Sequence, residues 1–185
     1  MSGRPSLRLF LAASLPEHVT WVGGRVAELR ERWPEARWIP PENQHVTLKF
    51  LGPTPESDLP GVVSVCERVA AVHGPEPIGL GQLGVFPSPR RARVLWIGLD
   101  DPAQLLASLA QALDAELAPL GFARESRPYS PHLTVARFRA PTVVRDPPVF
   151  REQPDPSDLR SFDLWRSHLS PKGARYERLV SFSLG

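Results

Sequence analysis

Two short segments of this sequence share one pattern, a histidine followed two residues later by a threonine. They are His45 with Thr47 and His132 with Thr134. On an extended strand, side chains two residues apart point to the same face, about 6.6 Å from each other. Each segment therefore offers an imidazole and a hydroxyl side by side, and such a pair fits around a phosphate group.

Two histidines in one cleft can supply both proton transfers that phosphodiester cleavage requires. Histidine titrates near neutral pH, so one ring can be neutral and accept a proton while the other is charged and donates one. Neutral hydroxyls can donate hydrogen bonds to the non-bridging oxygens, where negative charge increases. The pattern predicts that His45 and His132 are catalytic and that Thr47 and Thr134 bind phosphate.

Each motif alone has a simpler interpretation, because a histidine on a strand is usually a hydrogen-bonded structural residue. The repetition of the motif favours a catalytic role for the two histidines. A metal site is the competing use, but neither motif brings a second histidine or carboxylate at ligand spacing, and catalytic zinc normally takes three protein ligands. We expect no metal. The other histidines lack the pattern: we expect His18 and His73 at the surface and His168 beside the cleft.

Hydrophobic patterning around the motifs predicts two similar strand, helix, strand units. From Phe10 to His45 is 35 positions and from Trp96 to His132 is 36, a near equality that indicates internal duplication. The first unit comprises a buried strand at 7–13, a helix at 17–33 and a strand from His45 that turns at Gly52. The second comprises a strand at 94–99, a helix opened by Asp101 and Pro102, and a strand at 132–138.

Outside these units, the predicted elements are a helix at 57–72, a strand at 78–85 and a final hairpin. The hairpin strands are 161–168 and 176–184, joined around residues 171–173. A segment rich in proline and charge, residues 140–156, predicts a surface loop.

Composition places the chain among soluble globular proteins. Its 185 residues suffice for a single domain over residues 1–185, built of two lobes; 42% are hydrophobic and 23% charged. Cys66 is the only cysteine, which agrees with a reducing cytoplasm, and residues 1–5 begin no membrane span. We expect a cytoplasmic protein, monomeric and without a membrane partner.

Arginine supplies nearly all the positive charge, because Lys49 and Lys172 are the only lysines. The formal net charge is +2 and the sequence pI is about 9.1. Arginine favours planar, bidentate contacts with phosphate. Gene composition alone can explain many arginines, so only individually placed ones support a functional interpretation.

The paired motifs resemble those of the 2H phosphoesterase superfamily, and most closely the RNA 2′,3′-cyclic phosphodiesterases, also called 2′-5′ RNA ligases. The similarity covers almost the whole chain. It includes Arg8-Leu9-Phe10, Leu15-Pro16, His45 to Gly52, Arg93-Val94-Leu95-Trp96, Pro131 to Arg137 and Arg175-Tyr176.

The resemblance implies an α+β fold of two pseudo-symmetric lobes, each an antiparallel sheet with helices on its outer face, around a central cleft. It also implies opening of an RNA 2′,3′-cyclic phosphate end, or of a small cyclic nucleotide, to a 2′-phosphate without a cofactor. By the same likeness, His45 protonates the leaving 3′ oxygen and His132 activates water. Symmetry leaves the reverse assignment open.

Phe50 and Arg137, each five residues after a motif histidine, would clamp the terminal base in this family. An odd spacing opposes that role, because a regular strand would turn both side chains away from the histidines. The clamp requires a bulge in each strand; otherwise Phe50 belongs to the core.

Two alternatives remain at this point. The same site can join RNA ends through a 2′-5′ linkage if a 5′ hydroxyl replaces water. A non-catalytic RNA-end binding module could use the same side chains only to hold phosphate, with affinity but no turnover.

Overall fold

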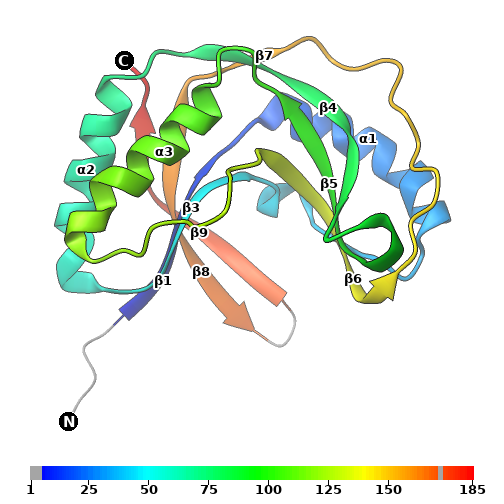
Figure 1. Ribbon diagram of the computed structural model, residues 1–185, viewed down its shortest axis with the longest axis horizontal. Helices are drawn as coiled ribbons and strands as arrows, with labels where there is room; N and C mark the ends of the chain where they lie inside the picture. The colour runs from blue at the N-terminus through cyan, green and yellow to red at the C-terminus, as the bar shows by residue number, and fades with distance from the viewer. Residues whose placement is uncertain (1–5, 171–172) are drawn as a thin grey trace.

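A computed structural model describes residues 6–170 and 173–185 of the protein (Figure 1). The described strands form two antiparallel sheets, ordered β3-β1-β8-β9 and β2-β6-β5-β4-β7. The helices are α1 (Pro16–Arg32), α2 (Leu59–Ala71) and α3 (Leu105–Leu117). The strands are β1 (Ser6–Ala13), β2 (Arg37–Trp38), β3 (Val46–Pro55), β4 (Glu76–Phe86), β5 (Ala92–Asp100), β6 (His132–Thr142), β7 (Ser157–Leu159), β8 (Ser161–Ser170) and β9 (Gly173–Ser183). The predicted bilobal α+β fold is confirmed.

The two histidine-bearing strands occupy equivalent places. β3 pairs with β1, placing Thr47 opposite Ala12, and β6 pairs with β5, placing Thr134 opposite Trp96. β1 has a strand on each side, and its residues 9–13 are all buried. This part of β1 is therefore continuously apolar, whereas exposed Ser6 and Arg8 alternate with buried Leu7 and Leu9.

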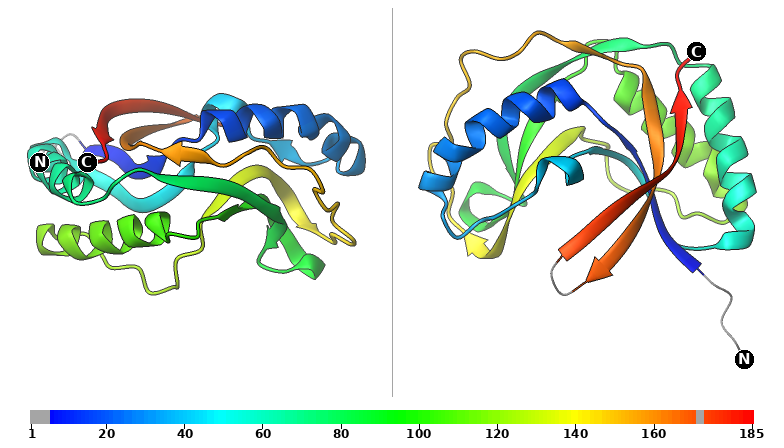
Figure 2. Two further views of the ribbon diagram at one scale, coloured as in Figure 1. Left: turned by 90° about the horizontal axis from the view of Figure 1, so that it is seen from above. Right: turned by 180° about the vertical axis from the view of Figure 1, so that it is seen from behind.

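Helices α1 and α3 each follow a strand of one sheet but pack against the other sheet. α1 follows β1 of the four-stranded sheet but lies beside the five-stranded one, where the His18 Nε2–H donates to the Ile78 carbonyl of β4 at 2.7 Å. α3 follows β5 but packs against β3, where Asp114 binds Lys49. Figure 2 shows α1 on one side of the molecule and α2 with α3 on the other. The two sheets thus share one hydrophobic core.

Several element boundaries differ from those that the sequence predicts, and for β3 and α3 the structure shows the cause. β3 continues through Gly52 to Pro55, because Gly52 adopts a φ of +72° that lets the strand bend and keep pairing with β1. α3 begins at Leu105, not at Pro102. Asp101 still caps it: the carboxylate accepts hydrogen bonds from the backbone N–H groups of Leu105 and Leu106, both at 2.9 Å.

The predicted surface position is wrong for His18 and holds in part for His73, which stays partly exposed. His18 is fully buried, since positions 18, 22 and 29 form the inner stripe of α1. His73 is half-buried between helices: its Nδ1–H donates to the Val69 carbonyl at 2.7 Å, and its Nε2 accepts from the Ser108 hydroxyl at 2.9 Å. Both ring nitrogens of His73 are hydrogen-bonded, whereas the Nδ1 atom of His18 is buried without a hydrogen-bond partner among the described residues.

The C-terminal half contains the predicted loop and hairpin. β6 extends to Thr142, and residues 143–156 then have no regular structure before the short β7. β8 and β9 form the predicted hairpin, although two of its predicted turn residues, 171–172, lie outside the described residues, as do residues 1–5. Within the described chain, no helix has the length and apolar character to cross a membrane.

Candidate active site

A cleft of about 430 Å³ lies between the two sheets, and all six predicted site residues line it. Its walls come from β1, β3, β5, β6 and the β8–β9 hairpin. The full set is Arg8, Leu9, Phe10, Ile39, Asn43, His45, Thr47, Phe50, Gly52, Phe86, Val94, His132, Thr134, Arg137, Ser167, Leu169, Ala174 and Tyr176. The duplicated motifs therefore contribute to a single site.

The two histidine rings are held in the same way. His45 Nδ1 lies 2.8 Å from the Asn43 carbonyl, and His132 Nδ1 lies 2.8 Å from the Ser130 carbonyl. A carbonyl can only accept, so Nδ1 carries the proton when each ring is neutral. This leaves Nε2 of both rings available as the acid or base atom toward a ligand in the cleft.

Aromatic side chains pack against the two histidine rings. Phe10 and His45 have ring centroids 4.9 Å apart, and Tyr176 meets His45 edge-on at 5.2 Å. In the second half, Trp96 lies 6.0 Å from His132. Phe10 and Trp96 lie at matching distances in sequence before the two histidines. Since each also packs against its histidine, the two halves of the site are equivalent in packing as well as in sequence.

A bulge in each strand brings Phe50 and Arg137 into the cleft. The pairing of β1 with β3 skips Leu48, and the pairing of β5 with β6 skips Val135. Each extra residue reverses the alternation of the strand. The side chains at the fifth position after each histidine consequently return to the cleft face, and Phe50 is 64% exposed. The alternative that buries Phe50 in the core is wrong.

The cleft is electropositive. Arg8 and Arg137 line it together with the two histidines, and none of the described residues that line it is an aspartate or glutamate. Burial lowers the pKa of His45 to about 4. The hydrogen bond to the Asn43 carbonyl opposes that shift, whereas the charges of Arg137 and His132 add to it. An anion bound here would face no opposing carboxylate.

Other residues complete the site, and sequence analysis gave them no role. Asn43 orients His45 through its carbonyl, and its side-chain amide donates to the Ala174 carbonyl of β9 at 3.2 Å. The Tyr129 hydroxyl donates to the Thr47 carbonyl at 3.0 Å and ties the loop before β6 to β3. The sequence does contain a signal for the carbonyls that bind the histidines, because Asn43 and Ser130 each lie two residues before a motif histidine.

His168 lies beside the cleft without lining it. Its Nε2 is 2.7 Å from a Glu177 carboxylate oxygen across the β8–β9 hairpin. The neighbours Ser167 and Leu169 do line the cleft.

Within residues 6–170 and 173–185, no group of three or more histidine, cysteine, aspartate or glutamate side chains is arranged to hold a metal ion.

Two related sheets that each present a histidine and a threonine to one cleft define the 2H phosphoesterase class of fold. The chain belongs to the 2′-5′ RNA ligase superfamily, whose family model matches residues 16–168.

Relatives named RNA 2′,3′-cyclic phosphodiesterase resemble most of the chain. The protein from Thermus thermophilus is 35% identical over 187 residues, covering 96% of this chain and 90% of its own. The protein from Methanothermobacter thermautotrophicus is 36% identical over 136 residues, 73% of each chain.

Solved structures support the same fold. A Thermus thermophilus protein superposes with a TM-score of 0.84 at 31% identity, covering 96% of this chain and 98% of its own. Escherichia coli LigT complexed with 3′-AMP gives 0.80 at 27% identity, covering 97% and 99%.

Proposed function

We propose that this protein hydrolyses RNA 2′,3′-cyclic phosphate ends to 2′-phosphate ends by metal-free two-histidine catalysis. The observation that carries the proposal is the matched pair, His45 and His132, each with Nδ1 on a backbone carbonyl and Nε2 left for the ligand. The names of the relatives and the 3′-AMP complex of LigT support an RNA-end substrate. Both halves of the site come from one chain, so a monomer suffices, and an RNA substrate agrees with a cytoplasmic location.

In the proposed reaction, water attacks phosphorus while His132 Nε2 takes its proton. The bond from phosphorus to the 3′ oxygen breaks, and protonated His45 delivers a proton to that oxygen. The products are a 2′-phosphomonoester and a free 3′ hydroxyl. Thr47 and Thr134 donate hydrogen bonds to the non-bridging oxygens, whose charge grows as the fifth bond to phosphorus forms.

The low pKa of His45 adds a condition to this assignment. With a pKa of about 4, His45 is neutral at pH 7 and carries no second ring proton to donate. A bound phosphodiester anion offsets the charge of Arg137 and raises the pKa of His45. The acid role of His45 therefore requires that a proton be taken up with the substrate.

Phe50 and Arg137 are proposed to hold the terminal base between them. An aromatic face and a guanidinium plane stack on any base, so the contact is tolerant of sequence. The bulges after Thr47 and Thr134 support the proposal, because they bring both side chains to the cleft face.

Ligation is the reverse of the same chemistry, with an RNA 5′ hydroxyl as the nucleophile. The description of the family as 2′-5′ RNA ligases favours it as a second activity. Water is in large excess over any RNA hydroxyl, so hydrolysis dominates unless a second RNA is bound beside the first.

The decisive experiment incubates the pure protein with RNA bearing a 2′,3′-cyclic phosphate and identifies the product by ³¹P NMR, with and without excess chelator. A 2′-phosphate formed at equal rates in both supports the proposal. A 3′-phosphate, or loss of activity in chelator that a divalent ion restores, overturns the mechanism. Binding without turnover would instead establish an RNA-end binding module.

A further inference from the structure

Four arginines form a basic surface directly beside the cleft. Arg90, Arg91 and Arg93 lie where a 3-10 helix (Pro89–Arg91) leads into β5, and Arg139 lies near the end of β6. The Arg93 Nη1–H donates to the Arg139 carbonyl at 2.8 Å, which holds the two segments together. All four residues are exposed. We name this set the arginine ridge.

The arginine ridge is continuous with the cleft. Val94 pairs with Arg137, and both residues line the cleft. Arg93 precedes Val94, and Arg139 follows Arg137 by two positions. None of the four ridge residues lines the cleft itself, but an RNA chain that leaves the cleft past Val94 and Arg137 would reach the segments that carry them.

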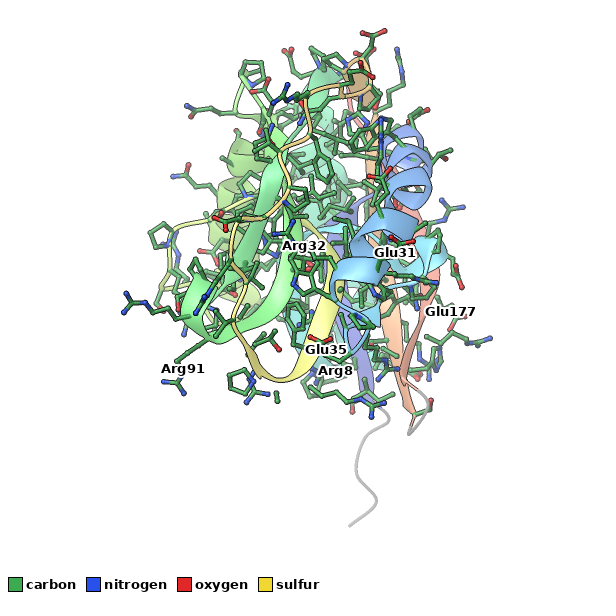
Figure 3. The ribbon with its side chains drawn as sticks, turned by 90° about the vertical axis from the view of Figure 1, so that its right-hand side faces the viewer. Arg8, Glu31, Arg32, Glu35, Arg91 and Glu177 are labelled. Atoms are coloured by element: carbon green, nitrogen blue, oxygen red, sulfur yellow. The ribbon has the colours of Figure 1, made fainter. Side chains whose placement is uncertain are left out.

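Little negative charge offsets the ridge. Among the described residues, none of its four guanidinium groups has a carboxylate partner within ion-pair distance. Two carboxylates lie on segments next to the ridge: Glu35 precedes β2, which pairs with β6 at Arg137, and Asp146 follows Val144, whose N–H donates to the Pro89 carbonyl at 2.8 Å. Figure 3 shows Glu35, Arg91 and Arg8 toward the same lower end of the molecule. Close positive charges on neighbouring strands repel one another, and a bound polyanion relieves that repulsion.

A second groove, which shares Phe50 with the cleft, has the opposite character. Phe50 also borders a groove of about 460 Å³ that contains Arg124 together with Asp58 and Glu125. Arg124 is already paired with Asp114 at 3.2 Å. The two carboxylates therefore outnumber the single engaged guanidinium, and a phosphate backbone is disfavoured there.

We propose that the arginine ridge binds the RNA backbone on the 5′ side of the cyclic end, so that the protein prefers oligonucleotides to cyclic mononucleotides. This inference rests on the proposed function. Bidentate guanidinium contacts with phosphates recognise the chain without reading its sequence. The ridge thereby determines substrate length, while the cleft determines the chemistry.

The test compares a 2′,3′-cyclic mononucleotide with a single-stranded RNA of about ten nucleotides bearing the same end. The ridge variant carries Arg90→Gln, Arg91→Gln, Arg93→Gln and Arg139→Gln. We expect kcat/KM for the RNA to fall about tenfold or more and kcat/KM for the mononucleotide to change less than about twofold. Four phosphate contacts also predict that raising salt from 50 to 200 mM weakens RNA binding by roughly 50-fold in the wild-type protein and far less in the variant.

A matched control removes four positive charges elsewhere, with Gln replacing Arg30, Arg127, Arg151 and Arg178, which are exposed, have no carboxylate partner within ion-pair distance among the described residues and do not line the cleft. If kcat/KM for the RNA fell equally in the control and ridge variants, net charge alone would explain the effect and the proposal would be overturned. Equal wild-type KM values for the two substrates, or a larger loss from Arg124→Gln than from the ridge variant, would also overturn it.

Binding of a 5′-fluorescent RNA with a 2′-phosphate end, followed by anisotropy, tests the ridge without turnover. We expect the ridge variant to bind this RNA about tenfold more weakly than the wild-type protein. That result would support the RNA-binding role of the ridge even if the protein did not hydrolyse cyclic ends. That result separates failure of the ridge from failure of the proposed function. Thermal unfolding of all variants verifies that each is folded.

Discussion

The Nζ atom of Lys49 lies 2.7 Å from Asp114 Oδ1 and joins the histidine-bearing strand β3 to helix α3. The Lys49 side chain is 1% exposed, and its Nζ also donates to the Ala123 carbonyl at 2.8 Å. Lys49 follows the bulge at Leu48 and directly precedes Phe50. In the second half Ala136 occupies the equivalent position. The first half therefore anchors its bulge with an ion pair and the second with apolar packing.

Removing one partner of this pair should destabilise the protein strongly. Asp114→Asn leaves a buried ammonium without its counter-charge, which typically costs about 3–5 kcal/mol in the free energy of unfolding. Lys49→Met combined with Asp114→Asn leaves no buried charge, so urea unfolding should show the double variant to be more stable than Asp114→Asn alone. A double variant no more stable than that single one would contradict the assignment.

The same pair predicts a loss of stability in acid. Burial by itself raises the pKa of Asp114, but hydrogen bonds from Lys49, the Glu125 N–H and Arg124 lower it to about 2. Because the folded value lies below the ordinary aspartate value of about 3.9, this contribution is complete above pH 4 and is lost as the pH falls toward 2. Melting temperatures measured across this range should converge for wild type and Asp114→Asn at the acid end.

The pKa of His45 should respond to Arg137. A positive charge nearby disfavours the imidazolium, so Arg137→Gln should raise the pKa of His45 from about 4 toward the ordinary value. The return should be partial, because burial is the largest cause of the shift. NMR titration of the His45 ring protons measures this directly. A pKa that is unchanged or lower in the variant would show that the guanidinium lies too far from the ring.

Proton uptake on binding provides a second measurement at the same residue. In a His132→Ala background, a cyclic mononucleotide should bind at pH 7 with net uptake of a proton by His45. Calorimetry in two buffers of different ionisation enthalpy detects it. Binding without proton uptake would exclude His45 as the acid and favour the exchanged roles.

Each motif histidine should be essential and each threonine less so. We expect His45→Ala and His132→Ala to lower kcat by about 10² to 10⁴, since each removes one of two proton transfers. Thr47→Ala and Thr134→Ala should cost less, because water can replace a neutral hydroxyl. Single-turnover kinetics on cyclic-ended RNA measures these losses. Near-normal kcat in a folded histidine variant would refute the two-histidine mechanism.

The base clamp predicts losses that depend on the base. Phe50→Leu and Arg137→Ala should raise KM for cyclic-ended RNA, and the losses should shrink on an abasic cyclic phosphate, which offers nothing to stack. The kcat/KM ratio of the two substrates is the relevant measurement. Equal losses on both substrates would assign Phe50 to packing and Arg137 to phosphate binding.

The sequence by itself determined the main helices and strands and the four motif residues of the site. The recurrence of histidine and threonine two positions apart, at matched distances from Phe10 and Trp96, predicts one cleft with two equivalent walls, and all four motif residues line it. Such patterns suffice because alternation along a strand and spacing along a helix are local properties, dictated by backbone geometry.

Tertiary structure decided what depends on neighbours distant in the chain. The bulges that bring Phe50 and Arg137 to the cleft arise from pairing with β1 and β5. The burial of His18 follows from the exchange of α1 onto the five-stranded sheet, and the low pKa of His45 follows from burial and from Arg137 of the other half. Strand register, burial and electrostatics sum over contacts between residues far apart in sequence, so no local pattern contains them.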